Sequence, residues 1–186
     1  MEEKESANSK NMKDVYKISL IFDVIKRYDN YIISTNAKAS LIIAFNSLIL
    51  GTALIKFSDI ISFYDSLIIK WIVGVILTLI SASSLLSLFF VFNVVYPYFG
   101  STTDEENQDN SLIYFGSVSK MGAKEYLEYL KSKTIEELST DLAEQATILA
   151  SGLIQKMRKM RQSINAIIFN LALIMLLIIL RVVKFL

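Results

Sequence analysis

The chain contains no cysteine and no histidine, and it has one proline and six glycines in 186 residues. The absence of cysteine excludes a disulfide framework and a cysteine-ligated zinc site. The absence of histidine removes the commonest general base and the commonest ligand of transition metals. Because proline and glycine are so rare, long stretches of the chain contain no residue that breaks a helix.

Catalytic and phosphate-binding motifs are also missing. The sequence has no P-loop, no GxGxxG and no GxSxG motif. Its net charge is only +1, which argues against a nucleic-acid binder with a broad basic surface. The adjacent carboxylates Glu136 and Glu137 suit a helix cap better than an acid–base pair. We therefore expect a protein that is not an enzyme, binds no nucleic acid and holds no metal or cofactor.

What the chain has in excess is hydrophobic sequence, with 53% apolar residues and a mean hydropathy of +0.47. The polar N-terminus, MEEKESANSK, is not a signal peptide, because it has neither a basic nor an apolar region. Three segments are predicted to cross a membrane: 39–57, 67–96 and 164–180. Trp71 and Tyr96 are typical of interfacial anchors for the second span, and Pro97 is expected to end it.

The last span continues a long helix that starts in water. Thr134 and Glu137 have the spacing of a capping box. After them, apolar residues recur on one helical face: Leu138, Leu142, Ala146, Leu149, Leu153, Met157, Met160 and Ile164. From 164 to 180 the helix is apolar on all sides, as a helix that enters lipid should be.

The remaining segments are predicted to form a helical bundle in the cytosol. Residues 1–11 are expected to be disordered, and 12–38 to form an amphipathic helix that continues into the first span. The segment 97–163 contains an acidic loop at 101–110, an extended apolar piece at 111–118, a short helix at 123–131 and the stalk helix. We expect Tyr126, Leu127 and Leu130 on the inner side of that short helix. The fold class is thus an all-α membrane protein with three transmembrane helices whose extensions form a cytosolic helical bundle.

Charge predicts the orientation of the chain in the membrane. Most basic residues lie in 1–38 and 97–163, whereas the opposite side has only Lys56, Lys70, Arg181 and Lys184. The positive-inside rule places the larger side, and with it the N-terminus, in the cytosol. The C-terminus is then expected outside.

Polar residues inside the spans have two interpretations. Asn46 suits an interhelical hydrogen bond, and the small or hydroxyl residues of the second span suit tight helix packing. The alternative is that these residues line a pore: Asn46, Gly74, Thr78, Ser81 and Ser84. Conductance without any ligand would favour a constitutive small channel.

Two groups of basic residues are candidates for ligand binding. Lys156 and Arg158 belong to a basic cluster that suits contact with anionic lipid headgroups, or alternatively with a ligand phosphate. Arg27 and Tyr28 pair a guanidinium with a phenol ring, which suits a phosphate and a stacked base.

At this point the sequence resembles the transmembrane Pycsar effectors of bacterial antiphage defence. The resemblance covers about residues 25–180 and depends on the order and spacing of several short motifs. These are Arg27-Tyr28-Asp29-Asn30-Tyr31, Lys38-Ala39, Asn46, Gly51, Leu112-Ile113-Tyr114-Phe115-Gly116, Glu125-Tyr126-Leu127, Asp141-Leu142-Ala143-Glu144-Gln145, Leu149-Ala150 and Lys156.

The resemblance implies a membrane effector that responds to cyclic UMP or cyclic CMP from a partner pyrimidine nucleotide cyclase. The effector would then impair the bacterial inner membrane and stop phage propagation, with the host cell arrested or killed. We expect a homo-oligomer whose ligand pocket is formed by Arg27, Tyr28, Tyr114, Phe115, Lys120, Lys156 and Arg158. The alternative function is a membrane-anchored scaffold whose coiled-coil stalk recruits a soluble partner.

Overall fold

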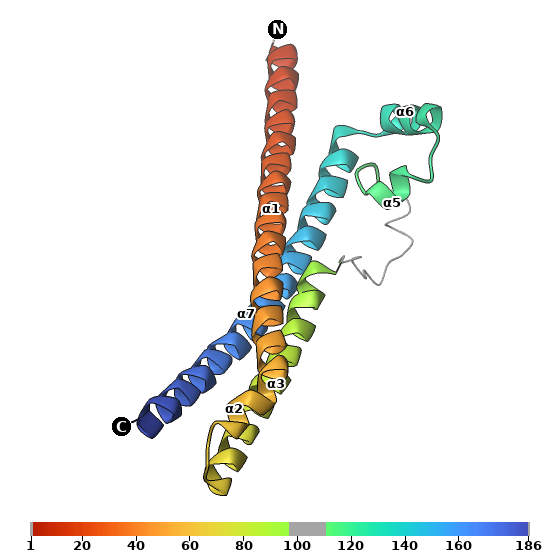
Figure 1. The fold of residues 1–186 in the computed structure, drawn as a ribbon. Helices are drawn as coiled ribbons and strands as arrows, with labels where there is room; N and C mark the ends of the chain where they lie inside the picture. Colours follow the sequence, from red (N-terminus) through yellow and green to blue (C-terminus); the bar gives the residue numbers. More distant parts are fainter. Residues whose placement is uncertain (1, 97–110, 186) are drawn as a thin grey trace. The chain divides into compact units, whose positions relative to one another are not determined.

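The computed structural model describes residues 2–96 and 111–185 (Figure 1). The helices in these ranges are α1 (Glu2–Ile55), α2 (Phe57–Ser62), α3 (Leu67–Val95), α5 (Phe115–Val118), α6 (Ala123–Ser132) and α7 (Ile135–Phe185). No strand occurs within the described ranges. Among the described residues, three helical segments, in α1, α3 and α7, are long and apolar enough to cross a membrane. The predicted all-α membrane fold is therefore confirmed.

Helix α1 is longer than the sequence predicted. It starts at Glu2, although residues 1–11 were expected to be disordered, and its 54 residues would extend ~80 Å. Its first glycine is Gly51 and it has no proline, so nothing interrupts it near the N-terminus. Adding residues to an existing helix costs far less than starting a new one, which explains why α1 continues through this polar segment.

In helix α7, most residues of the predicted apolar face are at least partly buried, which confirms that face. Leu142, Leu153 and Met160 are buried, and Leu138, Ala146 and Leu149 are half-buried, whereas Met157 and Ile164 are 49% and 41% exposed. The predicted face was therefore wrong at these two positions. Since 3.6 residues make one turn, a stripe of such length drifts around a straight helix.

The chain divides into two compact units, and α1 and α7 contribute to both. The first unit comprises residues 1–33 and 98–154, and the second comprises 34–97 and 155–186. Predictions about Pro97 and the acidic loop 101–110 lie outside the described residues.

In the first unit, Leu112 is buried, and so is Leu142 of α7. The segment 111–118 was predicted to be extended, but its second half forms α5. The reason is local, because Ser111 Oγ accepts hydrogen bonds from the backbone N–H groups of Ile113 and Tyr114, and so turns the chain.

Helix α6 was predicted to bury three side chains, and the structure corrects this. The hydroxyl of Tyr126 donates to the carbonyl of Leu112 at 2.9 Å. Leu127 and Leu130, however, are 50% and 41% exposed. A helix of 10 residues turns only about one third of its surface toward a neighbour, and here the two leucines lie beside that face.

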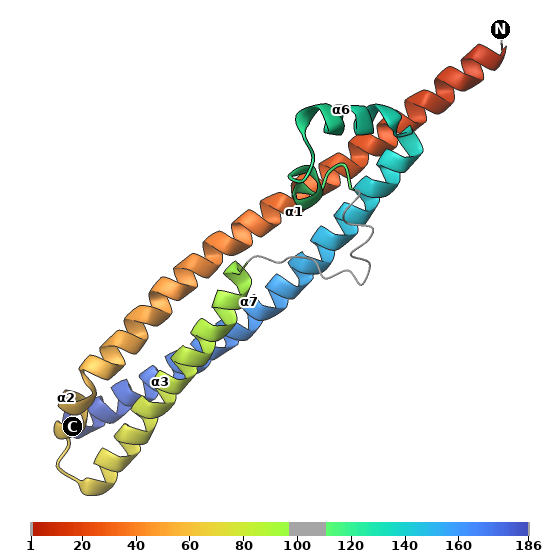
Figure 2. The ribbon, with the colours of Figure 1, turned by 90° about the vertical axis from the view of Figure 1, so that its right-hand side faces the viewer.

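The second unit packs α3 against the parts of α1 and α7 that belong to it (Figures 1 and 2). Three buried apolar clusters include residues of α3, and the second and third overlap along this helix. The first contains Ala39, Val91, Val94 and Met160, the second Ala53, Ile76 and Ile80, and the third Tyr64, Val73 and Leu77. Helix α1 ends at Ile55, just before the predicted limit at 57, and Lys56 separates it from α2.

Candidate functional sites

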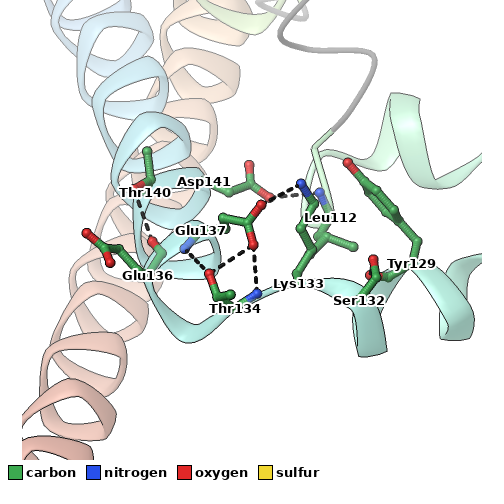
Figure 3. Close-up of polar contacts among 9 residues, drawn as sticks. All are labelled: Leu112, Tyr129, Ser132, Lys133, Thr134, Glu136, Glu137, Thr140 and Asp141. Atoms are coloured by element: carbon green, nitrogen blue, oxygen red, sulfur yellow. Dashed lines mark hydrogen bonds and ion pairs between the residues drawn. The ribbon is translucent and has the colours of Figure 1, made fainter.

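A network of polar contacts anchors the start of α7 in the first unit (Figure 3). Glu137 accepts the backbone N–H of Thr134 at 2.8 Å, and Thr134 Oγ1 accepts the N–H of Glu137 at 3.2 Å. The predicted capping box is therefore confirmed. The Thr134 N–H, the Thr134 hydroxyl and Lys133 together lower the pKa of Glu137 to about 2. The hydrogen bond to Glu137 in turn raises the pKa of Lys133.

One turn further along α7, Asp141 holds the segment that precedes α5. Its carboxylate accepts Ser111 Oγ at 2.6 Å and the Leu112 N–H at 2.7 Å (Figure 3 shows the latter). This contact holds the segment that leads through Ile113 to Tyr114 and Phe115, whose ring centroids lie 4.9 Å apart. Sequence reasoning included Asp141 only as part of the family resemblance and did not identify Ser111 as its partner.

The surface next to this anchor is acidic. Four carboxylates, those of Glu136, Glu137, Asp141 and Glu144, line a shallow pocket of about 270 Å³ together with Ser111, Lys133 and Thr140. Such an excess of negative charge does not suit a phosphate. In the described part of the chain, no group of three or more acidic, histidine or cysteine side chains is arranged to hold a metal ion.

The residues predicted to bind the ligand are divided between the two units. Arg27, Tyr28, Tyr114, Phe115 and Lys120 belong to the first unit, and Lys156 and Arg158 to the second. Arg27, Phe115 and Lys120 are exposed, and Tyr28 and Tyr114 are half-buried. Their assembly into one pocket stays a prediction.

Lys156 has a role in the second unit that the sequence did not suggest. It is only 8% exposed, and its ammonium group donates to the backbone carbonyl of Val94. It also lies 3.4 Å from Asn36 Oδ1 and from the carbonyl of Tyr96. The carbonyls of Val94 and Tyr96 are at the C-terminal end of α3, where a cation offsets the helix dipole. Arg158, by contrast, is exposed.

Five buried polar side chains form what we call the polar seam of the second unit. Its members are Asn46 of α1, Ser84 and Ser87 of α3, and Ser163 and Asn170 of α7, each with an exposed fraction of 0%.

Hydrogen bonds within the polar seam join all three helices. Asn46 Nδ2 donates to Ser87 Oγ at 2.6 Å, which confirms the predicted interhelical bond of Asn46. Ser87 and Ser163 each donate to the other's backbone carbonyl at 3.1 Å. Asn170 Nδ2 donates to Ser84 Oγ at 2.8 Å. Of these five residues, only Asn46 and Ser84 were named as candidates from the sequence; Ser163 in particular gave no signal of burial, because it lies next to a basic cluster.

The other three residues considered for a pore lie away from the polar seam. Thr78 donates to the carbonyl of Gly74 at 2.8 Å, and Ser81 to that of Leu77 at 3.0 Å. A side chain at Gly74 would meet Ile61 of α2 at 3.5 Å, so this glycine faces α2. These hydroxyls are therefore satisfied by their own helix, and their role in a pore stays a prediction.

A model of the Pycsar effector protein domain, PycTM, matches residues 20–183. The chain belongs to this family. It is also similar to the Pycsar effector protein EcPycTM of Escherichia coli, with 29% identity over 143 residues, which cover 74% of this chain and 76% of that protein. No solved structure matches the chain.

Membership of the Pycsar effector family confirms the resemblance that the sequence motifs suggested. The matched range includes the whole polar seam, the contacts of Asp141 with Ser111 and Leu112 (the Asp141 anchor) and all predicted ligand-binding residues, but not the first 19 residues. The sites described above therefore lie within the domain that defines Pycsar effectors.

Proposed function

We propose that this chain is a membrane effector of bacterial antiphage defence that is activated by cyclic UMP or cyclic CMP. A partner pyrimidine nucleotide cyclase supplies the nucleotide, and the activated effector impairs the inner membrane and stops phage propagation. The observation that carries this proposal is the match to the Pycsar effector domain over residues 20–183. The chain itself catalyses no reaction, a view supported by the absence of catalytic motifs from the sequence.

The helices supply a route from ligand binding to the membrane. Both α1 and α7 run without a break from the first unit into the second. A change in the first unit therefore moves helices that also belong to the second. For a shift from 1:99 to 99:1, the nucleotide must bind the active state more tightly than the resting state by about 5.5 kcal/mol.

Within the first unit, we propose that Arg27, Tyr28, Tyr114, Phe115 and Lys120 contact the nucleotide. The cations suit the phosphate, and the aromatic rings suit a pyrimidine base. The pair Tyr114–Phe115 supports this view, since the Asp141 anchor orients it and Phe115 remains 68% exposed. Lys156 and Arg158 belong to the second unit, and their contact with the nucleotide stays a prediction.

The proposed effector is a homo-oligomer with its N-terminus in the cytosol. Support comes from large apolar side chains that the first unit leaves exposed: Val15, Tyr16, Leu20, Phe22, Phe115, Leu127 and Leu130. Exposed apolar surface in water marks a site of protein association. A soluble partner bound to the same residues would instead make the chain a membrane-anchored scaffold.

Dye release from liposomes tests the proposal. The full chain is reconstituted in liposomes with a trapped dye, and cyclic UMP, cyclic CMP, cyclic AMP or cyclic GMP is added. We expect leakage with a cyclic pyrimidine nucleotide only. Correct insertion without leakage from any nucleotide would contradict the proposal, and a stoichiometric soluble partner in pull-downs would then favour the scaffold.

The same assay tests the ligand pocket. Arg27→Ala should weaken the response, since the variant lacks the guanidinium proposed to hold the phosphate. Lys26→Ala is the matched control, because it removes the same charge from a neighbouring exposed position of α1. Equal responses from both variants would show that Arg27 does not bind the nucleotide.

A further inference from the structure

The polar seam is an exception in the part of the chain that is most apolar. Its five side chains lie within helices that are long and apolar enough to cross a membrane. Apolar layers enclose it on both sides along α3, with Val91 and Val94 beyond Ser87, and Ile76 and Ile80 before Ser84. Polar residues in such helices face the protein interior or a water-filled cavity. The polar seam is thus a buried layer that lipid does not contact.

The hydrogen bonds of the polar seam are incomplete. Among the described residues, no group donates to Asn46 Oδ1 or to Asn170 Oδ1, although both oxygens are fully buried. Rotating either amide by 180° would only exchange the unpaired oxygen for an unpaired amino group. Buried acceptors without a partner are rare, because their loss of hydration is not compensated.

Water satisfies the polar groups of the seam better than the present packing does, whereas lipid does not. If the helices moved apart and lipid replaced them, the two asparagines would lose the hydrogen bonds they have and gain none. If water entered instead, both amide oxygens and all three hydroxyls would be hydrated. An opening of the helices along the polar seam is therefore favourable only where water fills it.

We infer that the polar seam is the surface that the activated effector exposes to water, and that water and small ions cross the membrane along it. This inference rests on the proposed function and assigns the membrane damage to Asn46, Ser84, Ser87, Ser163 and Asn170. In the resting state the apolar layers on both sides keep the polar seam dry, as hydrophobic constrictions do in channels. The two unpaired amide oxygens favour the open state, because only there are they hydrated.

The absence of cysteine from the chain makes this inference directly testable. Ser84→Cys, Ser87→Cys and Ser163→Cys place single thiols in the polar seam at nearly unchanged volume. Leu86→Cys is the control, since Leu86 is 51% exposed on another face of α3. A positively charged methanethiosulfonate is added to dye-loaded liposomes that hold each variant, with and without cyclic UMP or cyclic CMP. Thiols react as thiolates, so they react quickly only where water reaches them.

We expect the nucleotide that causes leakage to speed modification of at least two seam thiols by tenfold or more. Modification at position 86 should stay slow, because lipid covers it in both states. Leakage without faster modification at 84, 87 or 163 would overturn the inference and leave the proposed function in place. An absence of leakage with every nucleotide would overturn both.

Discussion

The ammonium group of Lys156 shows how one side chain can have two different interpretations. In the sequence it belongs to a basic cluster that suits lipid headgroups or a ligand phosphate. In the structure it points into the second unit and donates to carbonyls at the end of α3. Its neighbour Arg158 is exposed, as expected for the other members of such a cluster.

Replacement of Lys156 should destabilise the second unit. Lys156→Met leaves the carbonyls of Val94 and Tyr96 without their donor, which costs about 1–3 kcal/mol. Arg161→Met removes an equal charge from an exposed position of α7 and is the control. Thermal unfolding in detergent micelles, followed by circular dichroism, should show a clear decrease in Tm for Lys156→Met only. Equal decreases for both variants would mean that the carbonyl contacts of Lys156 contribute nothing.

The cap of α7 should make stability depend on pH. Because the folded pKa of Glu137 is about 2, below its ordinary value of 4.5, the carboxylate stabilises the helix start above about pH 4.5. This contribution is lost as the pH falls through the folded pKa, when Glu137 takes up a proton. The difference in Tm between the parent chain and Glu137→Gln should therefore be largest near pH 7 and disappear toward pH 2. A difference that does not change with pH would contradict the role of the charge.

Among the helices, α3 is the element around which the second unit is built. One of its faces alternates apolar layers with the polar seam, and it contacts α1 and α7 through both. Small residues at these contacts let helices approach closely enough for Ser87 and Ser163 to reach each other's backbone.

A double-mutant cycle on Asn170 and Ser84 measures the balance within the polar seam. Ser84→Ala leaves the amide of Asn170 with no partner, so it should destabilise by about 1–3 kcal/mol. Asn170→Leu removes the hydrogen bond together with the unpaired oxygen and should be close to neutral. The double variant should resemble Asn170→Leu, which gives a coupling energy equal in size to the cost of Ser84→Ala, about 1–3 kcal/mol. Additive effects in bicelle unfolding experiments would show that the two side chains do not interact.

At the scale of the whole molecule, the distribution of charge predicts a direction for the chain in the membrane. Single thiols test it in intact cells with a membrane-impermeant maleimide. Ser66→Cys lies between α2 and α3, and Ser151→Cys lies in the part of α7 that belongs to the first unit. Both positions are exposed. We expect labelling at 66 only, and labelling at 151 in intact cells would reverse the proposed orientation.

Features that depend on neighbouring residues could be predicted from the sequence. The capping box at Thr134 and Glu137 is confirmed, because its partners lie three residues apart and need no other part of the chain. Helix α3 (Leu67–Val95) occupies nearly the same residues as the span predicted at 67–96, since hydropathy alone separates it from its surroundings, and the limits of the span itself stay a prediction. The start of α1 was missed, because polar composition indicates solvent exposure but does not by itself exclude a helix.

The sequence by itself determined that this is an all-α protein with three segments able to cross a membrane and with the motifs of a Pycsar effector. These properties depend on the length, periodicity and order of residues along one chain. Only the tertiary structure decided that Lys156 caps α3, that Ser111 meets Asp141, and that Asn46, Ser87 and Ser163 share one buried layer. The physical reason is that each of these contacts joins residues from separate helices or loops, and its geometry is set by how these pack.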